Sequence, residues 1–590
     1  MRLAAIALGA ALASGCSNPS PAPIARPAER KTLQVLSTTD LHANLVGWDY
    51  VAAAPDGKRG LARAATVIER ARAENPCTLL VDSGDTLQGT PLGARAAKSR
   101  PHPVAAAMSP LGYAAMAIGN HDFDYGLGTL RQFARDAAFP LLAANVRDAV
   151  SDSPAFGTHV LRDVCGVTVG ILGLVTPATA KWERPDNVAG LRFDDPIETA
   201  RRYVPALRAA GADVVVVVIH AGPDRRPSLP AGQRLSDQPE AWSRDVSDAS
   251  QWTAPDDDPT ENEAARLPAE VPGIDAVLSG HTHQAIPSMR VGDTVLVQPN
   301  YWGSHVGKVT IDVERTGEHW SPRTRSSTLL SASGVDESPA TVALAKDAHE
   351  KTIAWLEQPL TTAKEAFPAG PVARLVDGGL TDLVNRVQMD AAEHAGFRVD
   401  ASATAVFGPP QGLPAGPITL RDVYGVYPYE SALVVVELTG ADVREALEHD
   451  ARYFKTLEVA RLPTRAEDLK SEPEGPDYNW DRWAGLEVTI DLTKPPGSRV
   501  AVLRLRGKNL EAGDRLRVAL NGYRAGGGGG FASLARGKIV WTAPLEMRDL
   551  IAGWLSGRKV IDGAEITGCD FTLVPELSGV IGGQRGRCGK

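Results

Sequence analysis

Side chains of the kind that bind metal ions or transfer protons gather in one short segment, Gly-Asn-His-Asp-Phe-Asp at residues 119–124. The apolar residues 113–118 precede it, so we expect it to form the loop at the carboxyl end of a buried strand. An amide, an imidazole and carboxylates are costly to place beside a core unless a metal ion or a substrate uses them. An ordinary polar turn is the alternative, and this segment alone does not exclude it.

Four other apolar runs in the first half of the chain end in polar residues of the same types. They cover residues 32–38, 78–81, 213–219 and 274–278, and their composition predicts buried strands. The polar residues that follow the five runs are Asp40, His42, Asp85, Asn120, His121, His220, His281 and His283. A single histidine at a strand end is more often an ordinary core or surface residue. Five predicted strands that are each followed by metal-binding residue types indicate that these residues form one common site.

The residue types at these strand ends select a class of metal ion. Imidazole nitrogens mixed with carboxylate and amide oxygens favour borderline divalent ions such as zinc, manganese, cobalt or iron, whereas calcium and magnesium prefer oxygen ligands. His281 and His283 lie two residues apart, so on an extended segment they do not easily bind one ion together. We therefore expect two divalent metal ions side by side.

Composition excludes several classes of protein. The 590 residues exceed what a single core accommodates, so two or more domains are expected. A hydrophobic fraction of 43% and a charged fraction of 23% are typical of a soluble globular protein. The net charge of −9 argues against a nucleic-acid polymer as partner, because no basic surface is available to replace counterions. No obligate protein partner is inferred.

The beginning of the chain has the pattern of a targeting segment. An apolar run at residues 3–12 follows Arg2, is too short to span a bilayer, and leads through small residues to Cys16. This pattern resembles a bacterial lipoprotein signal, in which Cys16 is lipidated. A plain signal peptide is the alternative. Both predict an exported, periplasmic protein, and a lipid on Cys16 would be its only contact with a membrane. The proline-rich residues 17–31 predict an extended tether.

If the protein is exported, its four remaining cysteines can form disulfides, because the compartment outside the cytoplasm is oxidising. Three connectivities are possible for four cysteines. Cys77 and Cys165 each lie at the edge of a predicted strand, while Cys569 and Cys588 share one short terminal segment. We expect the pairs Cys77–Cys165 and Cys569–Cys588.

The alternation of strands and helices predicts an α/β fold, with a change of pattern near residue 332. Residues 339–357 form an amphipathic helix pattern without a strand partner, and a second α/β region follows. The expected division is a signal peptide at 1–16, a tether at 17–31, a catalytic domain at 32–335, a connecting helix at 336–359 and a second domain at 360–590. The polar, proline-bearing residues 223–267 predict an insertion on the surface.

The order of the polar segments, Asp-x-His, Gly-Asp, Gly-Asn-His-Asp, His and Gly-His-x-His, resembles the calcineurin-like metallophosphoesterases. The resemblance implies a four-layer β-sandwich flanked by helices in the catalytic domain. One metal ion would be held by Asp40, His42, Asp85 and His283, and the other by Asp85, Asn120, His220 and His281. By the same resemblance, His121 would stabilise the departing oxygen and Asp124 would orient its imidazole.

Further segments resemble the periplasmic 5′-nucleotidase superfamily, and most of all its 2′,3′-cyclic-nucleotide 2′-phosphodiesterase/3′-nucleotidase branch. They include Thr-Asp-Leu-His-Ala-Asn at 39–44, Tyr-Pro-Tyr at 427–429, Tyr-Asn-Trp-Asp at 478–481 and Tyr-Arg at 523–524. The resemblance implies a second domain that clamps a nucleobase between Tyr429 and Tyr523. It implies hydrolysis of 2′,3′-cyclic nucleotides and 3′-nucleotides to nucleoside and phosphate. The glycines after Arg524 are expected to let the backbone approach the base or sugar.

Two departures keep other functions open. Phe-Gly-Pro-Pro-Gln at 407–411 stands where the 5′-nucleotidase branch has an arginine-bearing Asn-Gly-Gly-Gly-x-Arg segment, and the missing arginine weakens the case for a typical 5′-nucleotidase. Asp124, by contrast, resembles the 5′-nucleotidase branch more than the cyclic one. A 5′-nucleotidase or nucleotide-sugar hydrolase on the same scaffold is therefore the nearer alternative. A catalytically inactive surface protein that binds nucleotides is the other, and the complete ligand set argues against it.

Overall fold

The computed structural model describes residues 29–230, 233, 235–244, 246, 248–253, 260–376, 379–407, 412–429, 431–471, 477–566, 568, 570–577 and 580. The expected signal peptide with Cys16, most of the tether and the expected Cys569–Cys588 pair lie outside these residues. Among the helices that are described, none is both long enough and apolar enough to cross a membrane.

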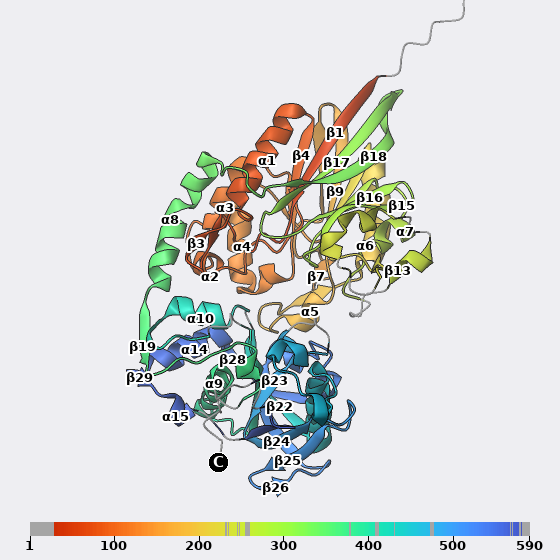
Figure 1. Ribbon diagram of the computed structural model, residues 1–590. Helices are drawn as coiled ribbons and strands as arrows, with labels where there is room; N and C mark the ends of the chain where they lie inside the picture. Colours follow the sequence, from red (N-terminus) through yellow and green to blue (C-terminus); the bar gives the residue numbers. More distant parts are fainter. Residues whose placement is uncertain are drawn as a thin grey trace, which may run out of the picture.

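Two six-stranded sheets face each other in the first half of the chain (Figure 1). The first sheet has the order β18 (His319–Ser331), β17 (His305–Thr316), β1 (Arg30–Thr38), β4 (Thr78–Asp82), β5 (Ala115–Ala117), β6 (Leu141–Leu142). The second has the order β15 (Ala285–Val291), β16 (Thr294–Pro299), β14 (Ala276–Ser279), β11 (Val214–His220), β9 (Val167–Val175), β8 (His159–Val164). Short pairs in the loops are β2 (Trp48–Asp49) with β3 (Ala54–Pro55), β7 (Val146–Asp148) with β10 (Leu191–Phe193), and β12 (Arg226–Pro227) with β13 (Trp252–Thr253).

The apolar runs of the sequence are continuous because their strands are buried on both faces. In β11, Val214, Val216 and Val218 point into the core between the two sheets. Val215, Val217 and Ile219 point the other way, toward the helices that cover the second sheet. Alternate side chains of a strand face opposite sides, and β11 accordingly has no polar residue between Val214 and Ile219, before its last residue, His220.

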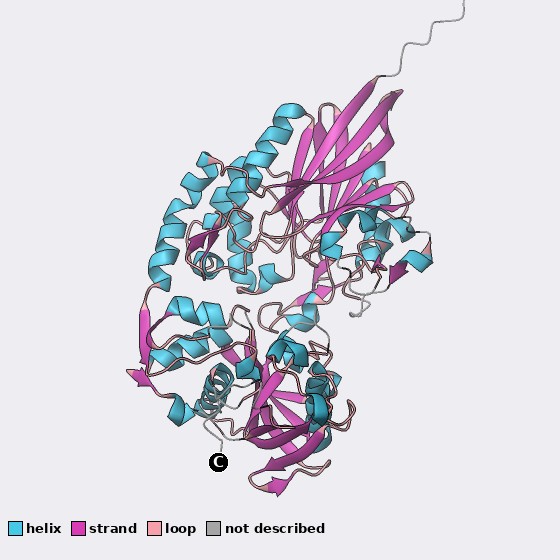
Figure 2. Cartoon of the chain, in the orientation of Figure 1, coloured by secondary structure: helices cyan, strands magenta, loops and turns pink. Residues whose placement is uncertain are grey.

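Helices cover the outer face of each sheet, which gives four layers (Figure 2). The first sheet is covered by α1 (Leu61–Glu74), α3 (Pro103–Met108) and α4 (Gly126–Asp136). The second is covered by α6 (Pro196–Ala209) and α7 (Arg266–Glu270). The expected four-layer arrangement of sheets and helices is confirmed.

A disulfide between Cys77 and Cys165 fastens the two sheets together. Cys77 directly precedes β4 of the first sheet, and Cys165 lies in the turn between β8 and β9 of the second. The cross-link therefore joins two elements that are 88 residues apart in the sequence.

A long helix, α8 (Pro339–Leu356), leads from the first half of the chain to the second. It packs against α1, α3 and α2 (Pro91–Ala96), and also contacts α10 (Leu420–Val426) of the second half. Arg421 of α10 donates to the Tyr50 carbonyl and to the Glu357 carboxylate. The connector is therefore packed on both halves.

The second half has an α/β arrangement that contains one core of its own and shares another with the first half. Its main sheet has the order β23 (Asp481–Ala484), β20 (Ala401–Ala405), β27 (Arg515–Asn521), β22 (Ala432–Thr439), β28 (Lys538–Glu546). The smaller sheets are β26 (Lys508–Asn509), β25 (Val500–Leu505), β24 (Leu486–Asp491), β30 (Phe571–Val574), and β21 (Gly416–Thr419), β19 (Pro359–Ala363), β29 (Val560–Ile561). Its helices include α9 (Leu380–His394), α11 (Gly440–Asp450), α12 (Gly522–Ala525), α13 (Ala532–Ala535), α14 (Met547–Ser556) and α15 (Gly563–Ile566).

Candidate metal centre

The polar residues that follow these strands lie close together because the strands within each sheet are parallel. β1, β4 and β5 run in one direction in the first sheet, and β9, β11 and β14 do so in the second. Their carboxyl ends therefore lie at one edge of each sheet, where ligand sites of α/β folds form. The residues delivered there are Asp40, His42, Asp85, Asn120, His121, His220, His281 and His283.

Two groups of these side chains are close enough to hold one ion each. The first is Asp40, His42 and His283, and the second is Asp85, His220 and His281; within each, the ligand atoms lie within 4.8 Å of one another. Asp85 lies between them, with its Oδ2 atom 3.0 Å from His220 Nε2 and 3.9 Å from His42 Nε2. The two neighbouring histidines of the Gly-His-x-His segment fall in different groups.

Two candidate ligand atoms of this centre lack, in the part of the chain that the structure describes, the hydrogen-bond partners that buried polar atoms normally have, as expected of atoms that bind a metal ion. Within the described residues, the buried Asn120 Oδ1 has no hydrogen-bond partner, nor does His220 Nε2 although Asp85 Oδ2 lies so near. The Nε2 atoms of His42 and His283 face each other at 3.0 Å. Unpartnered buried polar atoms are costly in a native protein. Together with the imidazole and carboxylate donors, they fit two divalent metal ions.

The second ring nitrogen of two of these histidines is already fixed by the backbone. His42 Nδ1 donates to the Gln88 carbonyl at 2.6 Å, and His220 Nδ1 donates to the Ser83 carbonyl at 2.7 Å. Such bonds select the tautomer whose Nε2 lone pair faces the metal position. The ring of His283 stacks on Tyr301, with centroids 4.7 Å apart.

The backbone at the site is held in an unfavourable conformation. Five residues of the two groups have positive φ angles: Asp40, His42, Asp85, His281 and His283. Such a conformation costs on the order of 1–3 kcal/mol per residue and persists only where the surroundings impose it. Close packing imposes part of it, because a Cβ atom on Gly119 would lie 2.2 Å from Asp85 Oδ1. The glycine before Asn120 is therefore required by the approach of the two loops.

Asp122 fastens the same two loops and is not a ligand of either group. Its carboxylate accepts hydrogen bonds from four backbone amides, those of Asp85, Thr86, Leu87 and Gly119. Burial, and then the neighbouring Asp85, raise the pKa of Asp122 to about 6. The sequence alone left the role of this carboxylate open.

Charges in the centre are strongly coupled. Burial would lower the pKa of His220, but the Asp85 carboxylate raises that pKa to about 9. Burial lowers the pKa of His42 to about 4, although Asp85 opposes the shift. Metal binding at His220 is therefore coupled to the release of a proton.

His121 belongs to neither group and lies beside both. Its side chain is 41% exposed, and its Nδ1 donates to Asp124 Oδ2 at 3.0 Å. Asn187 holds the pair from behind, since its Nδ2 donates to the Asp124 carbonyl at 2.9 Å and to Glu183 Oε2 at 3.2 Å. Burial, followed by Asp124, raises the pKa of Glu183 well above its usual range. The Nε2 atom of His121 is thereby directed away from Asp124.

In the second domain, the two tyrosines singled out by sequence are large aromatic side chains that stay half exposed. Tyr429 is 51% exposed and Tyr523 is 54% exposed. The rings of Phe407 and Tyr478 lie beside Tyr429, at centroid distances of 5.5 and 6.2 Å. Exposed aromatic faces of this kind stack on nucleobases.

Tyr523 is positioned by a buried ion pair and a glycine loop. Arg524, directly after it, binds both carboxylate oxygens of Asp481 at 2.7 and 2.8 Å. A Cβ atom on Gly528 would lie 2.5 Å from the Tyr523 ring. Gly528 thus gives the Tyr523 ring its room, and the approach of the glycine backbone to a base or sugar stays a prediction.

The comparisons with known proteins agree with this geometry. Residues 33–285 match the family described as calcineurin-like phosphoesterase, and residues 359–536 match the 5′-nucleotidase C-terminal domain. The two matches cover the metal centre and the aromatic site in turn. The chain belongs to the 5′-nucleotidase family of metallophosphoesterases.

Relatives of this metallophosphoesterase carry several activities in their names. The 2′,3′-cyclic-nucleotide 2′-phosphodiesterase/3′-nucleotidase of Salmonella typhimurium is 28% identical, over 89% of this chain and 86% of its own. The trifunctional nucleotide phosphoesterase YfkN of Bacillus subtilis is 27% identical over 90% of this chain. The match covers only 38% of the length of YfkN. The 5′-nucleotidase of Vibrio vulnificus is 25% identical over 85% of this chain and 86% of its own.

Solved structures show the same fold. A Staphylococcus aureus protein crystallised with alpha-ketoglutarate has a TM-score of 0.72 and 24% identity, over 92% of this chain and 100% of its own. The 5′-nucleotidase precursor of Thermus thermophilus has a TM-score of 0.57 and 23% identity over the same shares, 92% and 100%.

Four residues of this metallophosphoesterase site were missed by sequence reasoning: Trp182, Glu183, Asn187 and Glu261. Trp182 ends α5 (Thr179–Trp182), and its indole stacks on His281 with centroids 5.3 Å apart. Glu261 accepts a hydrogen bond from His281. Glu261 lies in the segment expected to be a surface insertion, so that expectation is wrong for the end of the segment. The sequence signal for a site residue was a polar side chain directly after a predicted strand, and none of these four residues has that position.

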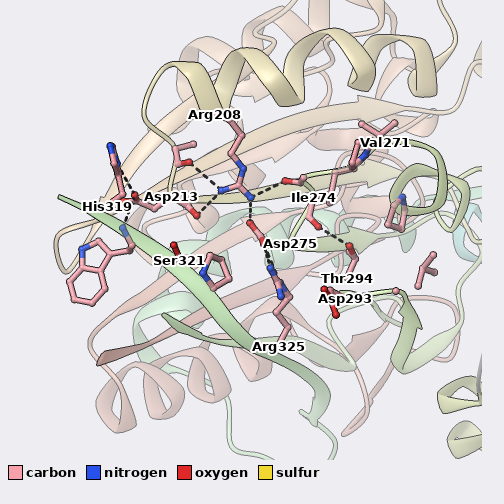
Figure 3. Close-up of a pocket in the computed structure, with 18 of the residues that line it drawn as sticks. Arg208, Asp213, Val271, Ile274, Asp275, Asp293, Thr294, His319, Ser321 and Arg325 are labelled. Atoms are coloured by element: carbon pink, nitrogen blue, oxygen red, sulfur yellow. Dashed lines mark hydrogen bonds and ion pairs between the residues drawn. The ribbon is translucent and has the colours of Figure 1, made fainter. Parts of the chain in front are cut away.

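A surface cavity of about 610 Å³ lies at the opposite end of the strands (Figure 3). It is lined by residues that precede β11 and β14, such as Asp213 and Asp275, whereas the histidines follow these strands. The buried Asp275 carboxylate is paired with both Arg208 and Arg325. The Asp275 carboxylate therefore bridges two guanidinium groups at this end of the strands, away from the metal centre.

Proposed function

We propose that this protein is a dinuclear metal-dependent phosphohydrolase that converts 2′,3′-cyclic nucleotides and 3′-nucleotides to nucleoside and phosphate. The observation that carries the proposal is the position of His121. An imidazole that is half exposed, held by a carboxylate and adjacent to two candidate metal clusters fits a proton donor to a departing alkoxide.

Seven residues would hold the two metal ions. Asp40, His42, Asp85 and His283 would hold the first, and Asp85, Asn120, His220 and His281 the second. Zinc, manganese, cobalt or iron suit this donor set. When bound, such a pair supplies Lewis-acid stabilisation of the phosphate and a nucleophile at neutral pH.

The remaining residues of the site would bind and protonate the substrate. Tyr429 and Tyr523, both half exposed, would stack on the base, and the phosphate would lie at the metal centre. His121 Nε2–H would donate to the departing ribose oxygen, and Asp124 would keep the ring in the orientation that makes this possible. Asn187 and Glu183 would keep Asp124 in place.

The preference for cyclic and 3′ substrates is supported by the relatives. Three relatives named for this activity match at 28% or 29% identity over 89–90% of the chain, whereas those named 5′-nucleotidase match at 24–25% over 85%. The second candidate is a 5′-nucleotidase or nucleotide-sugar hydrolase, which the Asp124 residue of the His121 loop favours by resemblance. Both candidates use the same metal centre.

A parallel assay of 2′,3′-cyclic AMP, 3′-AMP and 5′-AMP separates the two candidates. The protein would be stripped with a chelator, reloaded with Mn²⁺ or Zn²⁺, and followed for phosphate and nucleoside release. We expect metal-dependent turnover of the first two substrates. Turnover of 5′-AMP alone would replace the proposal by the second candidate.

We further infer that the chain is exported to the periplasm and anchored through a lipid on Cys16, with residues 17–31 as a tether. The domain division would be 32–335, 336–359 and 360–590, as the change of pattern in the sequence indicates. Mass spectrometry of the mature N-terminus tests the anchor. A diacylated Cys16 supports it, and an unmodified N-terminus beyond residue 16 contradicts it.

A further inference from the structure

The His281 imidazole is held by two residues that follow no strand of the sandwich. Its ring face stacks on Trp182, with an interplanar angle of 18°. Its Nε2 donates to Glu261 Oε1 at 3.0 Å. The His281 and Glu261 side chains are 12% and 21% exposed, so this hydrogen bond is largely shielded from solvent. The imidazole is therefore fixed in both tilt and rotation.

The segment that carries Glu261 is itself fastened to the metal centre. The next residue, Asn262, is 3% exposed, and its Oδ1 accepts from the Gly222 amide at 2.9 Å. Gly222 lies two residues after His220 and packs against Thr282, where an added Cβ would come within 2.3 Å of the Thr282 methyl group. The insertion thus reaches both histidine loops of the second cluster, so the position of Glu261 is set by the fold.

We propose that Glu261 is a positioning residue for the second metal ion, acting through His281. A carboxylate that accepts from one ring nitrogen of a metal-bound histidine fixes the tautomer and makes the other nitrogen a better ligand. Because Nε2 carries the proton that Glu261 accepts, Nδ1 of His281 is left with the lone pair for the ion. Two other proposed ligand histidines, His42 and His220, are fixed by backbone carbonyls, so within the described residues His281 differs from them in using a carboxylate side chain.

The inference rests on the proposed role of His281 as a metal ligand. Metal titration distinguishes a failure of the Glu261 proposal from a failure of the proposed metal centre. Metal-free protein would be titrated with Mn²⁺ or Zn²⁺ by calorimetry, for the unchanged chain and for Glu261→Ala, Glu261→Gln and Glu270→Ala. Glu270 is an acidic residue that pairs only with Arg201 and Arg266 among the ion pairs described, so it controls for a general loss of charge.

We expect the unchanged chain to bind two ions and Glu261→Ala to weaken one of the two by about 10–100-fold. Glu261→Gln should weaken it less, because an amide oxygen still accepts from Nε2, and Glu270→Ala should match the unchanged chain. Equal affinities in Glu261→Ala would overturn the proposal. An equal loss in Glu261→Gln and Glu261→Ala would also overturn it, since Glu261 would then act as a direct ligand. Absence of binding by the unchanged chain would instead overturn the proposed metal centre.

Discussion

The residues of the centre divide into those that would bind ions and those that would act on the substrate. The division follows from geometry, because His121 lies in neither cluster and bonds to Asp124 instead. Two histidines of similar surroundings in the sequence, His121 and His281, thus have different partners and different proposed roles. A variant that separates metal content from turnover distinguishes them.

Replacing His121 by alanine should abolish most turnover and leave both metal sites intact. The loss removes a proton donor, which is typically worth about 10²–10⁴-fold in rate. Turnover number and metal content by elemental analysis would be measured together, with His319→Ala as a control because that side chain is 77% exposed and far from the centre. Loss of a metal ion in His121→Ala would contradict the assigned role.

Glu183 should make the stability of the protein fall as pH rises. Burial and Asp124 raise its pKa above the ordinary value of 4.5, while His121 opposes the shift. Between the unfolded and folded pKa values, the native state keeps a proton that the unfolded chain has released, so the free energy of unfolding decreases as pH increases.

Glu183→Gln removes this dependence, because the amide is neutral at every pH and retains a donor and an acceptor. The variant should be more stable than the unchanged chain at about pH 8, and the difference should vanish below about pH 4. Denaturant unfolding at both pH values measures it. A constant difference across the range would show that Glu183 does not titrate between them.

Sequence reasoning found the residues that directly follow strands and missed those that do not. Asp40, Asp85, His220 and the Gly-His-x-His segment could be located because a buried strand cannot hold such residues before its end. Glu261 and Asn187 lie in loops whose course depends on tertiary packing, and no local pattern marks them. The positive φ angles of the ligands and the close approach of Gly119 to Asp85 likewise have no local pattern in the sequence.

Among the elements, the glycine loop after α12 decides where Tyr523 stands. Gly528→Ala would place a methyl group against the Tyr523 ring and displace it, at an overpacking cost of about 1–3 kcal/mol. We expect a raised KM for nucleotides with an unchanged rate on a small aryl phosphodiester. Gly513→Ala is the matched control, since an added Cβ there meets nothing within 4 Å. Equal KM values in the two variants would contradict this role.

The Cys77–Cys165 disulfide links β4 of the first sheet to the β8–β9 turn of the second. Removing it by the double change Cys77→Ser and Cys165→Ser should lower the free energy of unfolding by about 2–5 kcal/mol, since the closed loop is long. Denaturant unfolding measures the loss, and treatment of the unchanged chain with a reductant should reproduce it. Identical midpoints for both proteins would show that the cross-link contributes nothing.

On the scale of the whole molecule, the candidate metal centre lies in the part that matches the calcineurin-like phosphoesterases, and Tyr429 and Tyr523 lie in the part that matches the 5′-nucleotidase C-terminal domain. The pattern change near residue 332 predicts a second domain, but the contacts between the two halves of the chain depend on tertiary packing and could not be anticipated. Arg184, two residues after Trp182, binds Glu546 at 3.1 Å and the Pro544 carbonyl at 3.2 Å. The segment beside the metal centre therefore also contacts the second domain.

This division predicts that base and phosphate recognition separate by mutation. Tyr429→Ala and Tyr523→Ala should each weaken nucleotide binding by about 1–3 kcal/mol, the worth of one stacked base, and leave hydrolysis of a small aryl phosphodiester unchanged. Steady-state kinetics on both substrates measures the split. Equal losses on both substrates would show that the tyrosines support the fold rather than the base.

The most direct test of the account is anomalous diffraction from crystals of the protein soaked in Mn²⁺. We predict two peaks, one within the Asp40, His42, His283 group and one within the Asp85, His220, His281 group, with Asp85 between them. A single peak, or peaks only outside these groups, would contradict the dinuclear centre on which the proposed function depends.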